Sequence, residues 1–197
     1  MVFGKIKMKR CHLFLLLIML VIFLAGCARW PTDPNGGGNG DGQKLLRVRV
    51  DINQNGLINT EDGQYYIVFD TNKDAPFSPA DDIEDWETGF YYIRLDMMGF
   101  FLGEVLESGS SEQFLSGTVS DKYFQIMIPL QDIGDPEGIH MNVITTDLDN
   151  VTYDALDIDY YIDTNIISTK TENDFIQDSA GGPDFDISQV TTAILIP

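Results

Sequence analysis

From Leu45 onward, apolar residues recur at every second position rather than at every third or fourth. The clearest runs are 45–52, 65–69 and 123–130, and β-branched and aromatic residues dominate them. A period of two places alternate side chains on opposite faces of a strand, so these runs predict half-buried strands. Similar short runs predict further strands at 89–97, 99–106, 112–119, 139–146, 151–156, 158–163 and 190–196.

About ten short strands separated by Gly, Asn, Asp and Pro predict an all-β fold, an antiparallel β-sandwich of jelly-roll or immunoglobulin-like type. Polar alternation on many strands argues against a doubly wound parallel sheet. A short helical turn is expected near 130–133. Residues 70–87 are acidic, contain proline and are too many for a tight hairpin, so they are the best candidate for a functional loop.

The N-terminal residues have the composition of a secretory signal. Basic residues between positions 5 and 10 precede an unbroken apolar run over 13–25, which ends in Leu24-Ala25-Gly26-Cys27. A basic leader, a short apolar stretch and small residues before a cleavage point are typical of such signals. The run is shorter than the roughly 20 residues that span a bilayer as a helix.

The Leu-Ala-Gly-Cys tetrad resembles the lipobox of bacterial lipoproteins. This resemblance implies a signal peptide over 1–26, cleavage before Cys27 and lipidation of the Cys27 thiol, so that acyl chains anchor the protein to a membrane. Ala28, in place of Asp, resembles the signal for outer-membrane sorting. The expected location is therefore extracytoplasmic, at the outer membrane or the cell surface. An ordinary signal or anchor with an incidental cysteine is the alternative.

Removal of residues 1–26 changes what chemistry the chain can carry. The full chain has a net charge of −19; the mature chain would keep 8 basic and 31 acidic residues, a net charge of −23. This excess of acid argues against nucleic acid as a partner. Only His140 and the lipidated Cys27 would remain of the His and Cys residues, which excludes a disulfide framework and a Cys/His zinc site. Residues 27–44 are rich in Gly, Asn and Pro and predict a flexible tether before a domain over 45–197.

One short segment, 51–62, has oxygen-bearing residues at alternate positions and a glycine at the sixth. Calcium takes six to eight oxygen ligands, which such a loop can supply. The segment resembles the calcium loop of dockerin and EF-hand modules, which implies calcium as a cofactor. It departs from them because a strand follows where they have a helix, and an Asn/Gly-rich hairpin connection is the alternative. The implied ligands are Asp51, Asn53, Asn55, Leu57, Asn59 and Asp62.

Two further acidic arrays are candidates for divalent cations. Asp70, Asn72 and Asp74 follow a predicted strand, and a third array runs through residues 147–163. The alternative is a solvated acidic surface that keeps a secreted protein soluble.

Trp86 lies within the acidic loop, and we expect it to be partly exposed, where it can stack on a sugar ring. No Gly-x-Ser-x-Gly nucleophile motif occurs, and paired carboxylates suited to glycoside hydrolysis cannot be chosen among so many acids. The region 64–157 is similar to the ligand-binding β-sandwiches of the DOMON and family 9 carbohydrate-binding type, through the segments 65–70, 124–130 with 133–134, 141–144 and 154–157. The resemblance is at the level of fold and implies no particular ligand.

Together these features predict a lipid-anchored, extracytoplasmic β-sandwich that serves as a non-enzymatic binding or accessory module. Its expected partners are the membrane, through the lipid, and a glycan or envelope component. The alternatives are an assembly lipoprotein with a protein partner and, ranked below it, a hydrolase that uses an acidic pair.

Overall fold

The alternating segments fold as strands in the computed structural model, which describes residues 42–156, 158–176 and 179–196. Within these residues the chain forms twelve strands and two short 3₁₀ helices, so the predicted all-β class is confirmed. The strands are β1 (Leu45–Ile52), β2 (Gly63–Asp70), β3 (Tyr91–Asp96), β4 (Gly99–Leu106), β5 (Gly109–Leu115), β6 (Gly117–Val119), β7 (Tyr123–Pro129), β8 (Gly138–Asp147), β9 (Thr152–Ala155), β10 (Tyr160–Asp163), β11 (Thr169–Asn173) and β12 (Ile187–Leu195).

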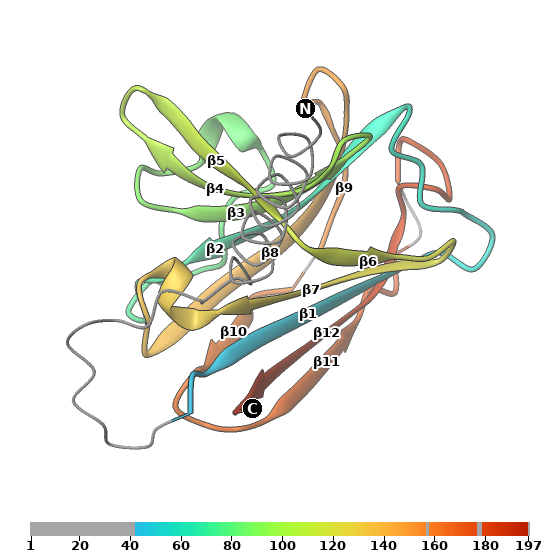
Figure 1. The fold of residues 1–197 in the computed structure, drawn as a ribbon. Helices are drawn as coiled ribbons and strands as arrows, with labels where there is room; N and C mark the ends of the chain where they lie inside the picture. The colour runs from blue at the N-terminus through green and yellow to red at the C-terminus, as the bar shows by residue number, and fades with distance from the viewer. Residues whose placement is uncertain (1–41, 157, 177–178, 197) are drawn as a thin grey trace, which may run out of the picture. The chain divides into compact units, whose positions relative to one another are not determined.

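The strands pair in two antiparallel sheets that pack face to face as a sandwich (Figure 1). The five-stranded sheet has the order β11-β12-β1-β7-β6, and these labels follow one another across one sheet in Figure 1. The seven-stranded sheet has the order β10-β8-β2-β3-β4-β5, with β9 also paired to β8.

The main core lies between the sheets and follows the period-two pattern. In β1 the burial alternates strictly, so Leu46, Val48 and Val50 face the core while the arginines between them face outward. In β2, Tyr65, Ile67 and Phe69 face the same core. The alternation that predicted the strands therefore also identifies which residues fill the sandwich.

Three local expectations have clear outcomes. The helical turn expected near 130–133 is the 3₁₀ helix η2 (Leu130–Ile133). The single strand expected over 112–119 is instead the end of β5 and all of β6, which lie at the edges of different sheets. Strand β11 was not expected, because its sequence, Thr-Lys-Thr-Glu-Asn, is polar and it pairs only with β12.

The outer face of the seven-stranded sheet carries a second, smaller apolar cluster. It forms because β2 is buried on both faces: Tyr66 and Val68 point away from the main core. The segment between β2 and β3, which contains the 3₁₀ helix η1 (Ile83–Asp85), covers them. The part of the predicted loop 70–87 around Ile83 and Trp86 is therefore packed against the sheet, while most of its other residues are exposed.

Candidate functional site

A pocket of about 570 Å³ opens beside this second cluster, and we call it the outer-face pocket. Three aromatic side chains form its apolar wall: Tyr66 from β2, Trp86 from the covering segment and Tyr92 from β3. Polar side chains that line it include Gln64, Arg94, Glu112 and Asn150. A volume of this size, with mixed apolar and polar walls, is in the range of small-ligand sites.

Hydrogen bonds hold the covering segment in place over the sheet. Asn142 of β8 donates its amide to the Pro79 carbonyl and to the Asp81 carboxylate, both at 2.9 Å. The Trp86 indole N–H donates to the Ala80 carbonyl at 3.0 Å. These bonds fix the indole ring in the wall of the pocket.

The expectation that Trp86 is exposed is wrong. Its side chain is only 8% exposed, and its ring packs edge-on against Tyr66, with ring centroids 5.5 Å apart and an interplanar angle of 78°. The charged sequence around Trp86 suggested exposure, but β2 presents an apolar outer face that the indole covers. Trp86 nevertheless lines the outer-face pocket, so a role in ligand binding stays a prediction.

The polar wall of the pocket is organised around Arg94. Its guanidinium contacts Glu112 (Nη2 to Oε2, 2.7 Å) and also pairs with Asp96. The Tyr92 hydroxyl donates to Glu112 Oε1 at 2.8 Å. These side chains face the same side because strand pairing places β3 and β5 on either side of β4.

The environment sets the charge states of this wall. Burial by itself would raise the pKa of Glu112, but hydrogen bonds from Arg94 and Tyr92 outweigh it and hold that pKa below its ordinary value. Burial raises the pKa of Tyr92 to about 12. Glu112 is therefore an ionised acceptor and Tyr92 a neutral hydroxyl at neutral pH.

A second polar group adjoins the first through Gln64, whose Oε1 accepts a hydrogen bond from Arg94 Nη1 at 3.4 Å. The Tyr66 hydroxyl is 3.0 Å from both Gln64 Oε1 and Asn150 Oδ1, and burial raises its pKa. Asn150 occupies the turn between β8 and β9 with a positive φ of 66°. The pocket thus presents amides, a hydroxyl and a carboxylate next to aromatic rings.

The residues of the predicted loop 51–62 do not gather around one point. The Asp51 carboxylate pairs with Arg49 on its own strand. Asn53 donates to Asp186 Oδ2 at 2.6 Å, while its own oxygen accepts the N–H of Asn55. Asn59 donates its amide to Asp62 Oδ2 at 2.9 Å.

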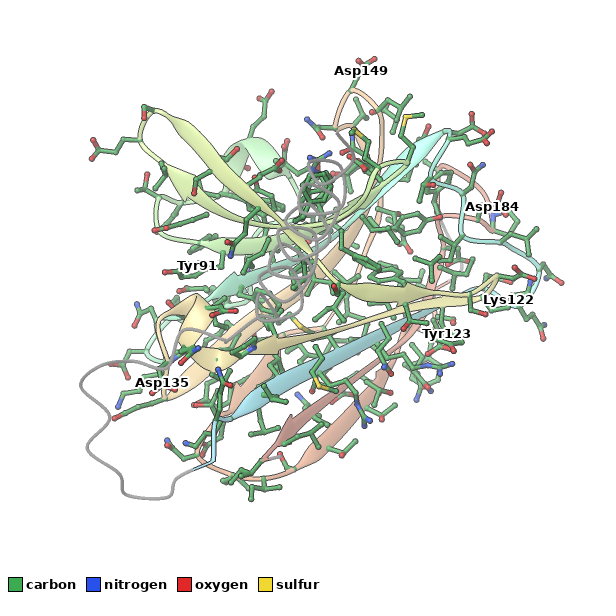
Figure 2. The ribbon with its side chains drawn as sticks, in the orientation of Figure 1. Tyr91, Lys122, Tyr123, Asp135, Asp149 and Asp184 are labelled. Carbon is green, nitrogen blue, oxygen red and sulfur yellow. The ribbon has the colours of Figure 1, made fainter. Side chains whose placement is uncertain are left out.

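The backbone of this loop is also engaged. The Leu57 N–H donates to Asp184 Oδ1 at 2.8 Å, and the Lys122 ammonium contacts the carbonyls of Gln54 and Gly56. Figure 2 labels Asp184 and Lys122 at the end of the domain where this connection between β1 and β2 runs. The positive charge next to these two carbonyls is therefore the ammonium group of Lys122. Calcium at this loop stays a prediction.

The second predicted group forms consecutive turns. Asp70 Oδ1 accepts the N–H of Asn72 at 2.8 Å, and Asn72 Oδ1 accepts the N–H of Asp74 at 3.2 Å. Such side-chain to backbone bonds are what Asp and Asn favour in turns. Among the described residues, no three side chains of the Asp, Glu, His and Cys types are placed to hold a metal ion.

Sequence reasoning missed the polar wall of the pocket. Gln64, Arg94 and Glu112 come from three strands, and only strand register brings them together. Gln64 and Arg94 each lie next to an apolar residue on a partly buried strand, whereas Glu112 lies between Ser111 and Gln113 on the exposed strand β5, where nothing in the sequence marks it. Cys27 and the tetrad before it lie outside the described residues.

No protein-family model matches the chain, and no curated protein or solved structure matches it significantly. In the part of the chain that the structure describes, there is no helix with the length and apolarity needed to cross a membrane. The functional argument therefore depends on the outer-face pocket and on the sequence.

Proposed function

We propose that this chain is a lipid-anchored, extracytoplasmic binding module whose outer-face pocket takes a ring of a neutral glycan. The observation that carries the proposal is the composition of the pocket: Tyr66, Trp86 and Tyr92 lie beside Gln64 and Glu112. A sugar ring offers an apolar face of C–H groups and a rim of hydroxyls. Aromatic walls suit the first, and fixed amide and carboxylate groups suit the second.

Charge argues for a neutral ligand rather than an anionic one. Arg94 is the cation of the pocket wall, and it is already paired with Glu112 and Asp96. The chain has a net charge of −19, which repels anions at a distance. An uncharged ring with several hydroxyl groups does not need Arg94 as a counter-ion and is not repelled by the negative charge of the chain.

The state of Glu112 favours binding over hydrolysis. A general acid in a glycosidase needs a raised pKa, so that it carries a proton at neutral pH. The pKa of Glu112 is lowered, and both of its oxygens accept hydrogen bonds from Arg94 or Tyr92. Glu112 is therefore suited to accept a hydrogen bond from a sugar hydroxyl rather than to protonate a leaving group.

The anchor is supported by the sequence alone, through the basic leader, the apolar run and the Leu24–Cys27 tetrad. A tethered binding domain at a membrane surface is consistent with that arrangement. The anchor is tested by feeding cells an alkyne-labelled palmitate and comparing the chain with Cys27→Ser. Label on the chain but not on Cys27→Ser is expected, whereas equal labelling contradicts the lipobox interpretation.

Glycan binding is tested with the full chain in detergent and a set of xylo-, cello-, malto- and chito-oligosaccharides. In a Trp30→Phe background, Trp86 is the remaining tryptophan, so its fluorescence reports on the pocket. Calorimetry with the same sugars gives the affinity. We expect at least one neutral oligosaccharide to bind and to change the Trp86 emission.

A matched pair of variants assigns the binding to the pocket. Glu112→Gln is expected to weaken it about tenfold or more, because a hydrogen bond to a charged group contributes about 1.5–3 kcal/mol. Glu107→Gln, an exposed residue beyond the end of β4, should leave it unchanged. Binding that resists Glu112→Gln, or no binding by any sugar, contradicts the proposal.

The alternative, an assembly lipoprotein with a protein partner, also has an observation behind it. Phe114 on edge strand β5 is 72% exposed, and Met97 and Met98 in the β3–β4 turn are exposed as well. Exposed apolar side chains of this size suit a protein interface. If all sugars fail, crosslinking from position 114 becomes the next experiment.

A further inference from the structure

Two buried carboxylates lie where the two sheets meet, outside the outer-face pocket. Asp154 belongs to β9 of the seven-stranded sheet, and Asp186 directly precedes β12 of the five-stranded sheet. They are 7% and 5% exposed. Asp154 Oδ2 accepts the N–H of Ile187 at 2.7 Å, which places the Asp154 carboxylate against the residue that follows Asp186.

One oxygen of Asp186 has no partner. Its Oδ2 accepts the Asn53 amide at 2.6 Å, and the backbone N–H of Asn53 donates to the Asp186 carbonyl at 2.8 Å. Its Oδ1 is buried and has no hydrogen-bond partner among the described residues. A buried carboxylate oxygen without a donor costs free energy that native structures ordinarily avoid.

The carboxylates also lack a counter-charge. Neither Asp154 nor Asp186 takes part in the ion pairs that the described residues form. The nearby Lys122 directs its ammonium to the carbonyls of Gln54 and Gly56 instead. Two acids in this arrangement need either a shared proton or a cation.

We propose that Asp154 and Asp186 bind one divalent cation of the calcium type, with Asn53 as the residue that positions Asp186. The free Asp186 Oδ1 and the Asp154 carboxylate are hard oxygen ligands, which Ca²⁺ prefers. The described residues contain no group of three acidic, His or Cys side chains placed for a metal, so backbone carbonyls and water would have to supply the remaining oxygen ligands of the ion.

An ion at this position would connect the two sheets. It joins β9 to the start of β12 and, through Asn53, to the end of β1, so it ties one sheet to the other. The site shares only Asn53 with the predicted loop 51–62. It is independent of glycan binding in the outer-face pocket, and either proposal can fail without the other.

The test is a calorimetric titration of the chelator-stripped full chain with CaCl₂ alone, together with melting curves in CaCl₂ and in EDTA. We expect one ion per chain with a Kd of about 1 mM or tighter, as in extracellular calcium modules. At a hundredfold excess over Kd the Tm should rise by about 5 °C or more. No heat and no shift in Tm overturns the proposal, and the two acids then share a proton.

Two variants separate this site from the predicted loop. Asp186→Asn should abolish both the heat and the rise in Tm, whereas Asp51→Asn should keep both. The reverse result assigns the ion to the loop 51–62 and overturns the proposal. Because Asp186→Asn removes a buried charge, we expect it to fold in EDTA. Asp154→Asn is the second variant, and a calcium response that survives it also overturns the proposal.

Discussion

The acidic residues of this domain fall into two groups that look alike in the sequence and differ in the structure. Asp51 and Asp70 lie at strand ends in partial contact with solvent, and their oxygens accept hydrogen bonds from Arg49 or from backbone N–H groups. Asp154 and Asp186 are buried, and neither takes part in the ion pairs of the described residues.

This difference shows why acid content alone does not locate a cation. Asp70 satisfies a local backbone N–H, which is the reason Asp and Asn are frequent in turns, and Asp51 pairs with the Arg49 side chain. One of the buried acids, Asp186, keeps a carboxylate oxygen, Oδ1, without a hydrogen-bond partner among the described residues. Burial without a counter-charge distinguishes the two groups, and at Asp186 an unmet hydrogen bond accompanies it.

The largest expected effect comes from Phe185, which holds the segment that carries Asp186. Its buried ring stacks on Tyr65, with centroids 5.5 Å apart, and contacts Tyr153 at 5.0 Å. Phe185→Ala should cost about 3–5 kcal/mol of unfolding free energy, as removal of a core aromatic does. Urea denaturation of the full chain in EDTA measures it.

Phe175→Ala is the matched control, because Phe175 is 84% exposed and its loss should change the unfolding free energy by less than about 0.5 kcal/mol. If the two variants lose equal stability, the 183–186 segment is not a packed part of the core. Asp186 would then not be held in a packed environment, and it would not differ from the surface acids.

The next effect is at Gly56, where the predicted loop meets that same segment. A Cβ placed on Gly56 would lie 1.8 Å from the Pro183 carbonyl oxygen. The backbones must separate to accept it, so Gly56→Ala should cost about 2–3 kcal/mol, a typical value for overpacking. Leu57→Ala, at a half-exposed neighbour, should cost much less. Equal melting temperatures for Gly56→Ala and the native chain contradict this close approach.

The contact at Gly56 illustrates what the sequence can and cannot predict. A glycine at the sixth loop position was interpreted as a calcium-loop turn, yet its φ is ordinary and the requirement is proximity to Pro183. The strands themselves were predictable because period-two burial is local to each strand, as in β1. Strand β11 was not, because its edge position leaves nothing apolar to recognise.

The two candidate sites were not predictable for a related reason. Asp154 and Asp186 are far apart in the chain and meet only because the end of β9 lies beside the start of β12. Gln64, Arg94 and Glu112 likewise depend on the register of three strand pairs. Local patterns determine which residues face inward, whereas the pairing of distant strands determines which side chains meet.

A smaller effect, of opposite sign, is expected at Asp154. In EDTA the chain keeps two buried carboxylates close together without a metal, so Asp154→Asn should stabilise it by about 1 kcal/mol. The amide oxygen can still accept the Ile187 N–H. Denaturation in EDTA measures this change, with Asp163→Asn, a partly exposed acid, as the control. If Asp154→Asn instead lowers the unfolding free energy, as a buried amide without hydrogen-bond partners would, then repulsion between the two carboxylates does not destabilise the chain.

The smallest effect is expected at Asp74, an exposed acid in the turn that follows Asp70. Its side chain is exposed, and the turn around it is held by Asn72, whose oxygen accepts the Asp74 N–H, a backbone bond that a substitution leaves in place. Asp74→Ala should therefore change the unfolding free energy by less than about 0.5 kcal/mol in EDTA and equally little in CaCl₂. The comparison of the two conditions is the informative part. Only a residue that binds the ion can change the difference in Tm between CaCl₂ and EDTA. If this difference shrinks in Asp74→Ala and is retained in Asp186→Asn, the solvent-exposed turn acids hold the ion.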